Sequence, residues 1–244
     1  MRIISLSPSL TEILTALDLE RDLIGVTEDC PKFLSPKFCL GSPKALDLEK
    51  FDDLKPDLIL ADTGQNRPDQ ISRLKEKYRV ISYGFSSIPS LIKATGDLGE
   101  LLEKVEPAKK LIREIYEVWE PAPADPVRTL ILLWNSPFLT VNANTYASSI
   151  IEAAGGLNVF RDDPVPEIPI EIEDMIDQTP DLILLPGAPF PFSGNHLNYF
   201  QNLPPFSQKT VRLIDGAWIA RCGPQTISAL KGLKSMIQEM KHAR

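Results

Sequence analysis

The amino-acid sequence predicts an α/β protein of two lobes, each with a mostly parallel sheet flanked by helices and joined by a rigid backbone helix. Three observations predict this fold class. Short, continuously apolar segments alternate with helical ones, as in chains built from βα units. A motif from the first half of the chain recurs in register in the second half. A long helical pattern separates the two halves.

Composition narrows the possible functions. The 244 residues include 26 Lys and Arg against 33 Asp and Glu, which gives a net charge of −7. A nucleic-acid-binding protein needs basic residues to neutralise phosphates, so no nucleic-acid partner is expected. No apolar run approaches the roughly 20 residues of a membrane-spanning helix, so no membrane insertion is expected.

The first half of the chain contains three predicted strands. The strand at residues 57–61 is continuously apolar after its first residue, Asp57, as expected for a strand covered on both faces. Ser9 and Glu12 have the spacing of a capping box and predict the start of a helix. The predicted strands are residues 2–6, 57–61 and 79–83, and the predicted helices are residues 10–17 and 68–78.

The second half repeats this alternation of strands and helices. Gly155 and Gly156 predict the end of a helix. The predicted strands are residues 129–134, 181–185 and 211–215, and the predicted helices are residues 145–154 and 226–241.

An internal repeat relates the two halves. Residues 48–60 align without gaps with residues 172–184, at an offset of 124 residues, and the identical positions include the Glu and the Pro-Asp-Leu-Ile-Leu run. The repeat is too long for a solenoid unit and predicts duplication of a whole lobe. The alternative is that a helix followed by Pro-Asp and an apolar strand recurs by chance in α/β proteins.

The segment between the halves has a helical pattern. Leu111, Ile115, Val118 and Trp119 fall on one helical face. We therefore expect an N-terminal lobe at residues 1–87, a connecting helical segment at 88–121 and a C-terminal lobe at 122–244. A helical connection predicts lobes with nearly fixed positions and a cleft between them.

Several motifs resemble one known family. They are residues 3–14 and 23–27, residues 54–60, and residues 153–160. The chain resembles the helical-backbone periplasmic binding proteins, the substrate-binding subunits of ABC transporters for cobalamin, haem and ferric siderophores. It is most similar to the cobalamin-binding-protein-like subgroup, and within it to members without a secretion signal, through residues 133–138, 189–192 and 215–218.

This resemblance implies a class III binding-protein fold with little hinge motion and a ligand at the lobe interface. It also implies that a Glu on each lobe, Glu49 and Glu173, docks onto arginines of a membrane permease. One acidic residue per lobe suits a partner of two-fold symmetry. The alternative is that both glutamates only stabilise the first turn of a helix through its dipole.

Aromatic residues are candidates for ligand binding in the second lobe. In open α/β sheets, ligands bind beyond the carboxyl ends of the strands. Five rings fall there: Trp134, Phe138, Phe190, Phe192 and Trp218. They suit a flat, mostly apolar ligand such as a corrin or porphyrin. Trp134 is also expected in the lobe core, whereas Phe190 and Phe192 alternate with prolines and are expected in an ordered, exposed loop.

Polar candidates lie in predicted loops of both lobes. His196 could be an axial metal ligand, a donor to a carboxylate, or a surface histidine. Arg67 and Arg221 could bind ligand carboxylates or phosphate, or form ion pairs between the lobes. Tyr83 ends a predicted strand of the first lobe.

Cysteines are sparse in the sequence. The chain has three, which is not a disulfide framework. Cys30 and Cys222 fall in predicted cleft loops and, with His196, could bind a soft metal, but no metal-binding spacing is present. A buried, inert cysteine is the commoner outcome. The identity of any bound metal stays open.

The sequence also departs from its relatives. The cobalamin carriers have aromatic residues where this chain has Asp29, Pro43 and Asp62, and signal-less relatives have a His shortly after position 30, where this chain has Pro31-Lys32-Phe33. These departures indicate a more polar cleft or a smaller ligand.

Three functions are compared. The first is non-catalytic binding, in the interlobe cleft, of a metal-containing small molecule: cobalamin or another corrinoid, haem or a ferric chelate. The second is a cytosolic sensor or scaffold of the same fold with another small ligand or a protein partner. The third is an enzyme acting on a cofactor precursor, for which no nucleophile, P-loop or dinucleotide motif is found. We expect no enzyme activity and no required cofactor.

The expected location is the cytoplasm, since an apolar strand begins at once where a secretion signal would stand. If a signal was removed, the alternative is the periplasm or cell surface, with an ABC permease as partner.

Overall fold

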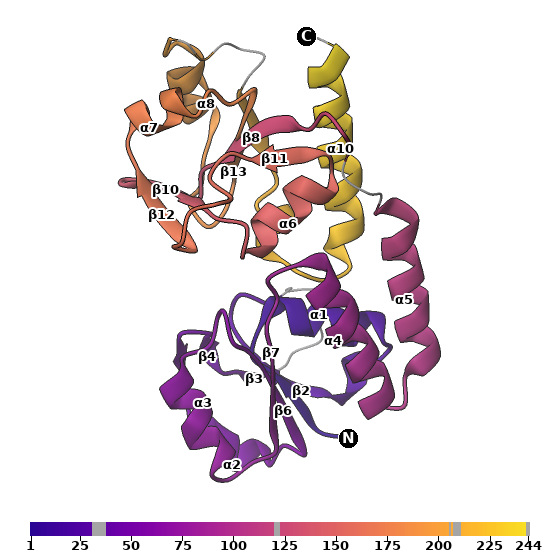
Figure 1. Ribbon diagram of the computed structural model, residues 1–244. Helices are drawn as coiled ribbons and strands as arrows, with labels where there is room; N and C mark the ends of the chain where they lie inside the picture. Colours follow the sequence, from indigo (N-terminus) through magenta and orange to yellow (C-terminus); the bar gives the residue numbers. More distant parts are fainter. Residues whose placement is uncertain (31–37, 120–122, 205, 207–210, 243–244) are drawn as a thin grey trace. The chain divides into compact units, whose positions relative to one another are not determined.

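The structure is a computed structural model and describes residues 1–30, 38–119, 123–204, 206 and 211–242 (Figure 1). The chain divides into two compact units, Met1–Phe85 with Pro89–Arg113 and Ser86–Ile88 with Glu114–Arg244. Each unit is an α/β fold with a parallel sheet, which confirms the predicted fold class. The predicted boundaries at residues 87/88 and 121/122 stay predictions, and the second lies outside the described residues.

The first unit contains a five-stranded parallel sheet in the order β3-β2-β1-β6-β7. A short antiparallel hairpin, β4–β5, follows β3. The strands are β1 (Ile3–Ser5), β2 (Leu23–Val26), β3 (Phe38–Cys39), β4 (Gly41–Ser42), β5 (Ala45–Leu46), β6 (Leu58–Asp62) and β7 (Val80–Tyr83), and a 3-10 turn (η1) spans Glu20–Asp22.

Helices cover both faces of this sheet. They are α1 (Pro8–Ala16), α2 (Lys50–Leu54), α3 (Pro68–Lys75) and α4 (Ile88–Leu101). Figure 1 shows α2 and α3 along one side of the sheet and α1 and α4 along the other. Ile4 and Ile59 share one buried cluster with Phe51 of α2 and Leu74 of α3. Because side chains alternate along a strand, the neighbouring residues of β1 and β6 face the opposite helical layer.

The predicted capping box of α1 is wrong by two residues. The helix begins at Pro8, and Ser7 is its N-cap, with the Ser7 hydroxyl accepting a hydrogen bond from the Leu10 amide at 3.3 Å. Proline is favoured in the first helical turn because its missing N–H would have no partner there. Ser9 and Glu12 are therefore helical residues, both buried.

The second unit repeats the sheet of the first. Its parallel sheet has the order β11-β8-β13-β14, which matches β2-β1-β6-β7. The strands are β8 (Val127–Ile131), β11 (Gly156–Asn158), β13 (Leu182–Pro186) and β14 (Val211–Ile214). Strands β6 and β13 begin and end 124 residues apart, as the repeat predicts.

An antiparallel sheet, which the sequence did not reveal, adjoins this repeat. It has the order β12-β10-β9, with strands β9 (Trp134–Asn135), β10 (Phe138–Val141) and β12 (Glu167–Ile170). The predicted strand at residues 129–134 is wrong at its end, because the chain turns into a hairpin after β8. The Leu133 amide donates to the Leu139 carbonyl at 2.7 Å, and Trp134 belongs to β9.

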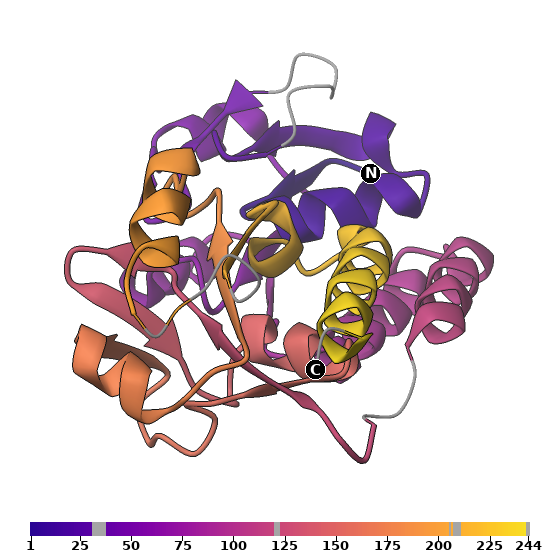
Figure 2. The ribbon, with the colours of Figure 1, turned by 90° about the horizontal axis from the view of Figure 1, so that it is seen from above.

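The helices of the second unit are α6 (Tyr146–Ala153), α7 (Ile172–Asp177), α8 (Gly194–Gln201), α9 (Ala217–Ala220) and α10 (Gln225–His242). Helices α6 and α10 pack together, as Figures 1 and 2 show, and the Tyr146 and Thr226 hydroxyls lie 2.7 Å apart between them. None of the helices in the described ranges is long and apolar enough to cross a membrane.

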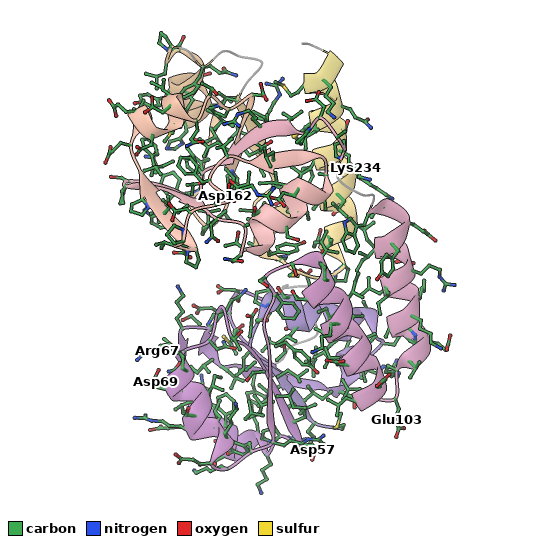
Figure 3. The ribbon with its side chains drawn as sticks, in the orientation of Figure 1. Asp57, Arg67, Asp69, Glu103, Asp162 and Lys234 are labelled. Carbon is green, nitrogen blue, oxygen red and sulfur yellow. The ribbon has the colours of Figure 1, made fainter. Side chains whose placement is uncertain are left out.

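The connecting segment is a pair of helices. Helix α4 is followed by α5 (Val105–Val118), and the chain turns between them at Glu103, which has φ +56° and is labelled in Figure 3. A Cβ atom at Gly99 of α4 would overlap the Cβ of Ala108 in α5, so only glycine permits this close approach. The segment thus contains two helices, and the division between the two units at Arg113 and Glu114 falls within α5.

Candidate functional site

Two loops at the carboxyl ends of parallel strands carry aromatic residues in the second unit. Trp134 and Phe138 lie in the hairpin that follows β8. Phe190, Phe192 and His196 follow β13, with His196 in the first turn of α8. Since β8 and β13 are neighbouring parallel strands, the two loops leave the same edge of the sheet.

Four of these side chains form an aromatic cluster, defined as Trp134, Phe190, Phe192 and His196. The Phe190 ring centroid lies 5.5 Å from that of Trp134, 4.8 Å from that of Phe192 and 5.3 Å from that of His196. All three contacts are edge-to-face, the geometry that the charge distribution of aromatic rings favours. The structure thus brings together four residues that are up to 62 positions apart in the sequence.

Exposure separates a surface part of the cluster from a buried part. Trp134 is 41% exposed, so the expectation that it is a core residue is wrong. Phe192 is 6% exposed and belongs to the hydrophobic core, so its expected place in an exposed loop is wrong. Phe138 is partly buried against the same core, and its ring centroid lies 5.7 Å from that of Phe200 at an interplanar angle of 57°. Trp134 is therefore the most accessible large ring of the aromatic cluster, and Phe190 packs against it.

His196 is fixed by the start of its own helix. Its Nδ1 atom accepts a hydrogen bond from the Ser193 amide at 3.1 Å and lies 3.0 Å from the Ser193 hydroxyl. Its ring also meets Phe192 edge-to-face at 5.5 Å. The ring orientation is thus set by one backbone donor and by ring packing.

Trp218 and Arg221 lie at the two ends of the short helix α9. Trp218 is half-buried against α10, where a Cβ atom at Gly232 would overlap its indole ring. This contact anchors α9 on α10. Arg221 is the half-buried C-cap of α9 and donates its amide to the Ala217 carbonyl at 3.1 Å. Ligand binding by these two residues stays a prediction.

In the first unit, a buried polar network lies at the carboxyl end of β6. The Asp62 amide donates to Asn66 Oδ1 at 2.7 Å, and Asp62 Oδ1 accepts from the Gly64 amide at 2.9 Å. Burial raises the pKa of the Asp62 carboxyl to about 6, against the opposing effect of hydrogen bonds from the Gly64 amide, the Ser7 hydroxyl and the Gln65 amide. Asp62 is therefore easier to protonate than an ordinary aspartate.

A pocket of about 220 Å³ adjoins this network. The Ser82 hydroxyl oxygen is buried and has no hydrogen-bond partner among the described residues. The polar residues that line the pocket include Asp62, Asn66, Ser72, Lys75 and Ser82. Of the 62–67 loop, the sequence predicts only Arg67 as a site residue, and it does not predict Asn66 or Ser82. An Asp with a Gly two residues later, after a buried strand, was the available signal for the Asx-type turn.

Asn66 ties this turn to two other loops. Its side-chain amide donates to the Leu6 carbonyl at 2.9 Å and to the Pro43 carbonyl at 3.1 Å. Every polar group of this buried side chain is thus satisfied, which holds the pocket wall rigid.

The other first-unit candidates have varied surroundings. Tyr83 is half-buried at the end of β7, and burial, followed by the nearby Asp97 carboxylate, raises its pKa. Arg67 is exposed at the N-cap of α3, and its Nε donates to Asp69 Oδ1 at 3.0 Å (Figure 3). Their roles in ligand binding stay predictions.

Cys30 is buried between two threonines. Its Sγ lies 3.1 Å from the Thr11 hydroxyl and 3.4 Å from the Thr27 hydroxyl, and burial raises its pKa. A thiol in this environment is a poor source of the thiolate that metals bind. Within the described ranges, no three His, Cys, Asp or Glu side chains are placed to hold a metal ion.

The repeated glutamates both lie where a helix begins. Glu49 is the exposed residue before α2, and Glu173 is exposed in the first turn of α7. Both positions fit the helix-dipole alternative, and both are accessible to a partner. Docking by these residues stays a prediction.

Comparisons with known proteins extend over the whole chain. A family model described as periplasmic binding protein matches residues 3–190. The vitamin B12-binding protein of Vibrio parahaemolyticus is 26% identical over 260 aligned positions, covering 100% of this chain and 91% of the relative. That of Pectobacterium atrosepticum is 27% identical, covering 99% of this chain and 90% of the relative.

Solved structures share the fold. The periplasmic vitamin B12-binding protein of Vibrio cholerae superimposes with a TM-score of 0.81 at 21% identity, covering 98% of this chain and 97% of the other. The periplasmic haem-binding protein of Roseiflexus sp. RS-1 gives a TM-score of 0.83 at 21% identity and covers 98% of both chains.

The family model, the relatives and the shared fold agree. Proteins of this kind bind a substrate and are not enzymes, and their ligands are cargo and not cofactors. Since the family model covers more than three quarters of the residues, the chain belongs to the periplasmic binding protein family.

Proposed function

We propose that this protein binds a metal-containing small molecule of the tetrapyrrole or metal-chelate class and passes it unchanged to an ABC permease. Cobalamin or another corrinoid, haem and ferric chelates are the candidate ligands. The single observation that carries the proposal is the match, over nearly the full length of both chains, to relatives named vitamin B12-binding proteins.

The aromatic cluster supports this ligand class. Trp134 exposes a large ring, and Phe190 packs edge-on against it from a different loop. A macrocycle is flat and largely apolar, so it gains most from a rigid aromatic wall of this kind. Two rings held by mutual packing also lose little freedom on binding, which favours affinity.

A thermal shift panel tests the proposal. The purified protein is melted with cyanocobalamin, haem, a ferric siderophore or no addition. A ligand that binds only the folded state raises the melting temperature with its concentration relative to Kd. We expect one of these compounds to raise it in a saturable way, and a melting temperature unchanged by all three would contradict the proposal.

A second candidate is a smaller, polar ligand, as in a sensor of the same fold. The first-unit pocket favours it, because Asp62, Asn66 and Ser82 make its wall polar. Asp62 also stands where the resemblance places an aromatic residue in cobalamin carriers. Amino acids and small carboxylates in the same panel separate this candidate from the first.

We propose that the protein works outside the cytoplasmic membrane. The family to which it belongs is described as periplasmic, and so are solved relatives of the same fold. Separation of the native host's cells into extracytoplasmic and cytoplasmic fractions tests this location. Recovery of the protein in the cytoplasmic fraction alone would favour the cytosolic sensor.

We also propose that Glu49 and Glu173 form the docking contacts for the permease. One exposed carboxylate at the start of α2 and another at the start of α7 present the same group on each unit. The double variant E49R/E173R should abolish ligand uptake by cells while ligand affinity stays unchanged. The control variant E106R/E117R reverses the charge of two exposed glutamates of α5 and should leave uptake intact.

A further inference from the structure

His196 has a defined proton position, which follows from one hydrogen bond. A backbone N–H can only donate, so the Nδ1 atom that receives the Ser193 amide at 3.1 Å must be unprotonated. The Ser193 hydroxyl, 3.0 Å away, donates to the same atom. The neutral imidazole therefore carries its proton on Nε2.

The remaining ring nitrogen is left for a ligand. The His196 ring is half-buried, and Nε2 makes no hydrogen bond within the part of the chain that the structure describes. Edge-to-face contacts with Phe190 and Phe192, at interplanar angles of 86° and 83°, keep the ring from turning. The Nε2–H group is thus held in place at the edge of the aromatic cluster.

This proton position decides between two roles for His196. A metal binds imidazole through an unprotonated nitrogen. Coordination through Nε2 would move the proton to Nδ1, where it would face the Ser193 N–H and break the cap of α8. Donation of a hydrogen bond from Nε2 needs no such change.

We infer that His196 recognises a hydrogen-bond acceptor on the rim of the ligand, such as a carboxylate or an amide carbonyl, and does not coordinate the ligand's metal. The inference rests on the proposed function and names the chemistry of one contact within it. Trp134 and Phe190 would cover the apolar face of the same ligand.

The proton position can be measured without any ligand. Long-range ¹H–¹⁵N NMR spectra distinguish the two neutral tautomers of histidine, and the chain has only two histidines. The H242Q variant identifies which signals belong to His196. We expect the Nε2–H tautomer, and a proton on Nδ1 would overturn the inference whether or not any ligand binds.

Two matched variants test the binding role. H196Q and H196E both supply an oxygen that can accept from the Ser193 amide, and both fit the third helical position of a capping box. Only Gln also supplies an N–H donor near the place of Nε2. The probes are haem and its metal-free porphyrin, which have the same carboxylates.

The two roles predict different results for H196Q. If His196 donates to the ligand, H196Q stays close to wild type, whereas H196E loses about tenfold or more for both porphyrins. The visible spectrum of bound haem stays the same in wild type and H196Q. If His196 coordinates iron, H196Q changes that spectrum and weakens haem alone, and this result would overturn the inference. Failure of wild type to bind either porphyrin or cobalamin would count against the proposed function, and the NMR result would still decide the tautomer.

Discussion

Arg2 and Arg128 make the same hydrogen bonds in the two units. The Arg2 amide donates to Asp57 Oδ2 at 2.7 Å, and the Arg128 amide donates to Asp181 Oδ2 at 2.9 Å. Each guanidinium also donates to backbone carbonyls at the end of the helix before the next strand, Leu54 in one unit and Gln178 in the other. We call this arrangement the arginine–aspartate clasp.

The residue after each of these helix ends has the same backbone shape. Lys55 has φ +45° and Thr179 has φ +43°, both in the left-handed region. Non-glycine residues rarely adopt it, so its recurrence 124 residues later is strong evidence that the two units are copies of one ancestral lobe.

Loss of the clasp should destabilise each unit. Asp181→Ala removes the acceptor for the Arg128 amide, and we expect a loss of about 1–3 kcal/mol in the free energy of unfolding. Asp57→Ala should cost less, because Asp57 is exposed and Asp181 is half-buried. Denaturant unfolding measures both, with the exposed Glu117→Ala as the control. Equal, negligible effects of all three variants would show that the clasp does not stabilise the fold.

Only part of this duplication can be recognised from the sequence. The repeated run ends in the first residues of β6 and β13, and its apolar part recurs because both strands are buried along their whole length. The sequence does not show that Arg2 and Arg128 are equivalent. They are 126 residues apart, so an ungapped alignment with an offset of 124 does not pair them. Their equivalence appears only in the structure, where Asp57 accepts from the Arg2 amide and Asp181 from the Arg128 amide.

Asp62 should make stability depend on pH. Its pKa is about 6 in the folded protein, against an ordinary value of 3.8. The folded state therefore binds this proton more tightly, so the contribution of Asp62 is full below pH 3.8 and is lost as the pH rises through about 6. Two pKa units correspond to about 3 kcal/mol as an upper bound.

Asp62→Asn should remove this dependence. We expect the variant to be more stable than wild type at pH 8 and the difference to shrink as the pH falls from about 6 toward 4. Melting curves across this range, with the exposed Asp53→Asn as control, measure it. A variant that is less stable at pH 8 would mean that the Asp62 carboxylate is stabilised, and not penalised, by its surroundings.

The three cysteines should differ sharply in reactivity. Cys39 is exposed, whereas Cys30 and Cys222 are buried. We expect iodoacetamide to modify Cys39 quickly in the folded protein and to reach Cys30 only after unfolding, because burial both covers the thiol and raises its pKa. Peptide mass spectrometry over time reads each site. If Cys30 were modified as fast as Cys39, its thiol would be accessible in the folded protein, and Cys30 would again be a candidate for ligand binding.

The aromatic cluster should divide into binding and folding residues. Phe192→Ala should lower stability by about 3 kcal/mol or more, since it opens a cavity in the core. Trp134→Ala should leave the melting temperature nearly unchanged and weaken ligand binding. Thermal melts and ligand titrations on both variants test the division. Unaltered affinity in Trp134→Ala would remove this side chain from the site.

Sequence patterns alone do not distinguish the exposed Trp134 from the buried Phe192. Trp134 stands at the end of an apolar run and Phe192 follows a proline, and neither local pattern indicates the hairpin β9–β10. Strands of two residues carry no periodicity, so that hairpin was invisible, and it is the hairpin that carries Trp134 to the surface. The Asn66 contacts with Leu6 and Pro43 likewise join loops far apart in the sequence.

The most direct test of the account is an equilibrium titration of the purified protein with cobalamin and with haem, followed by recovery of the ligand. The account predicts saturable binding of at least one of them, weakened in Trp134→Ala, and release of the ligand chemically unchanged. No binding of either compound, or release of an altered product, would contradict the conclusion that this chain is a binding protein for this class of molecule.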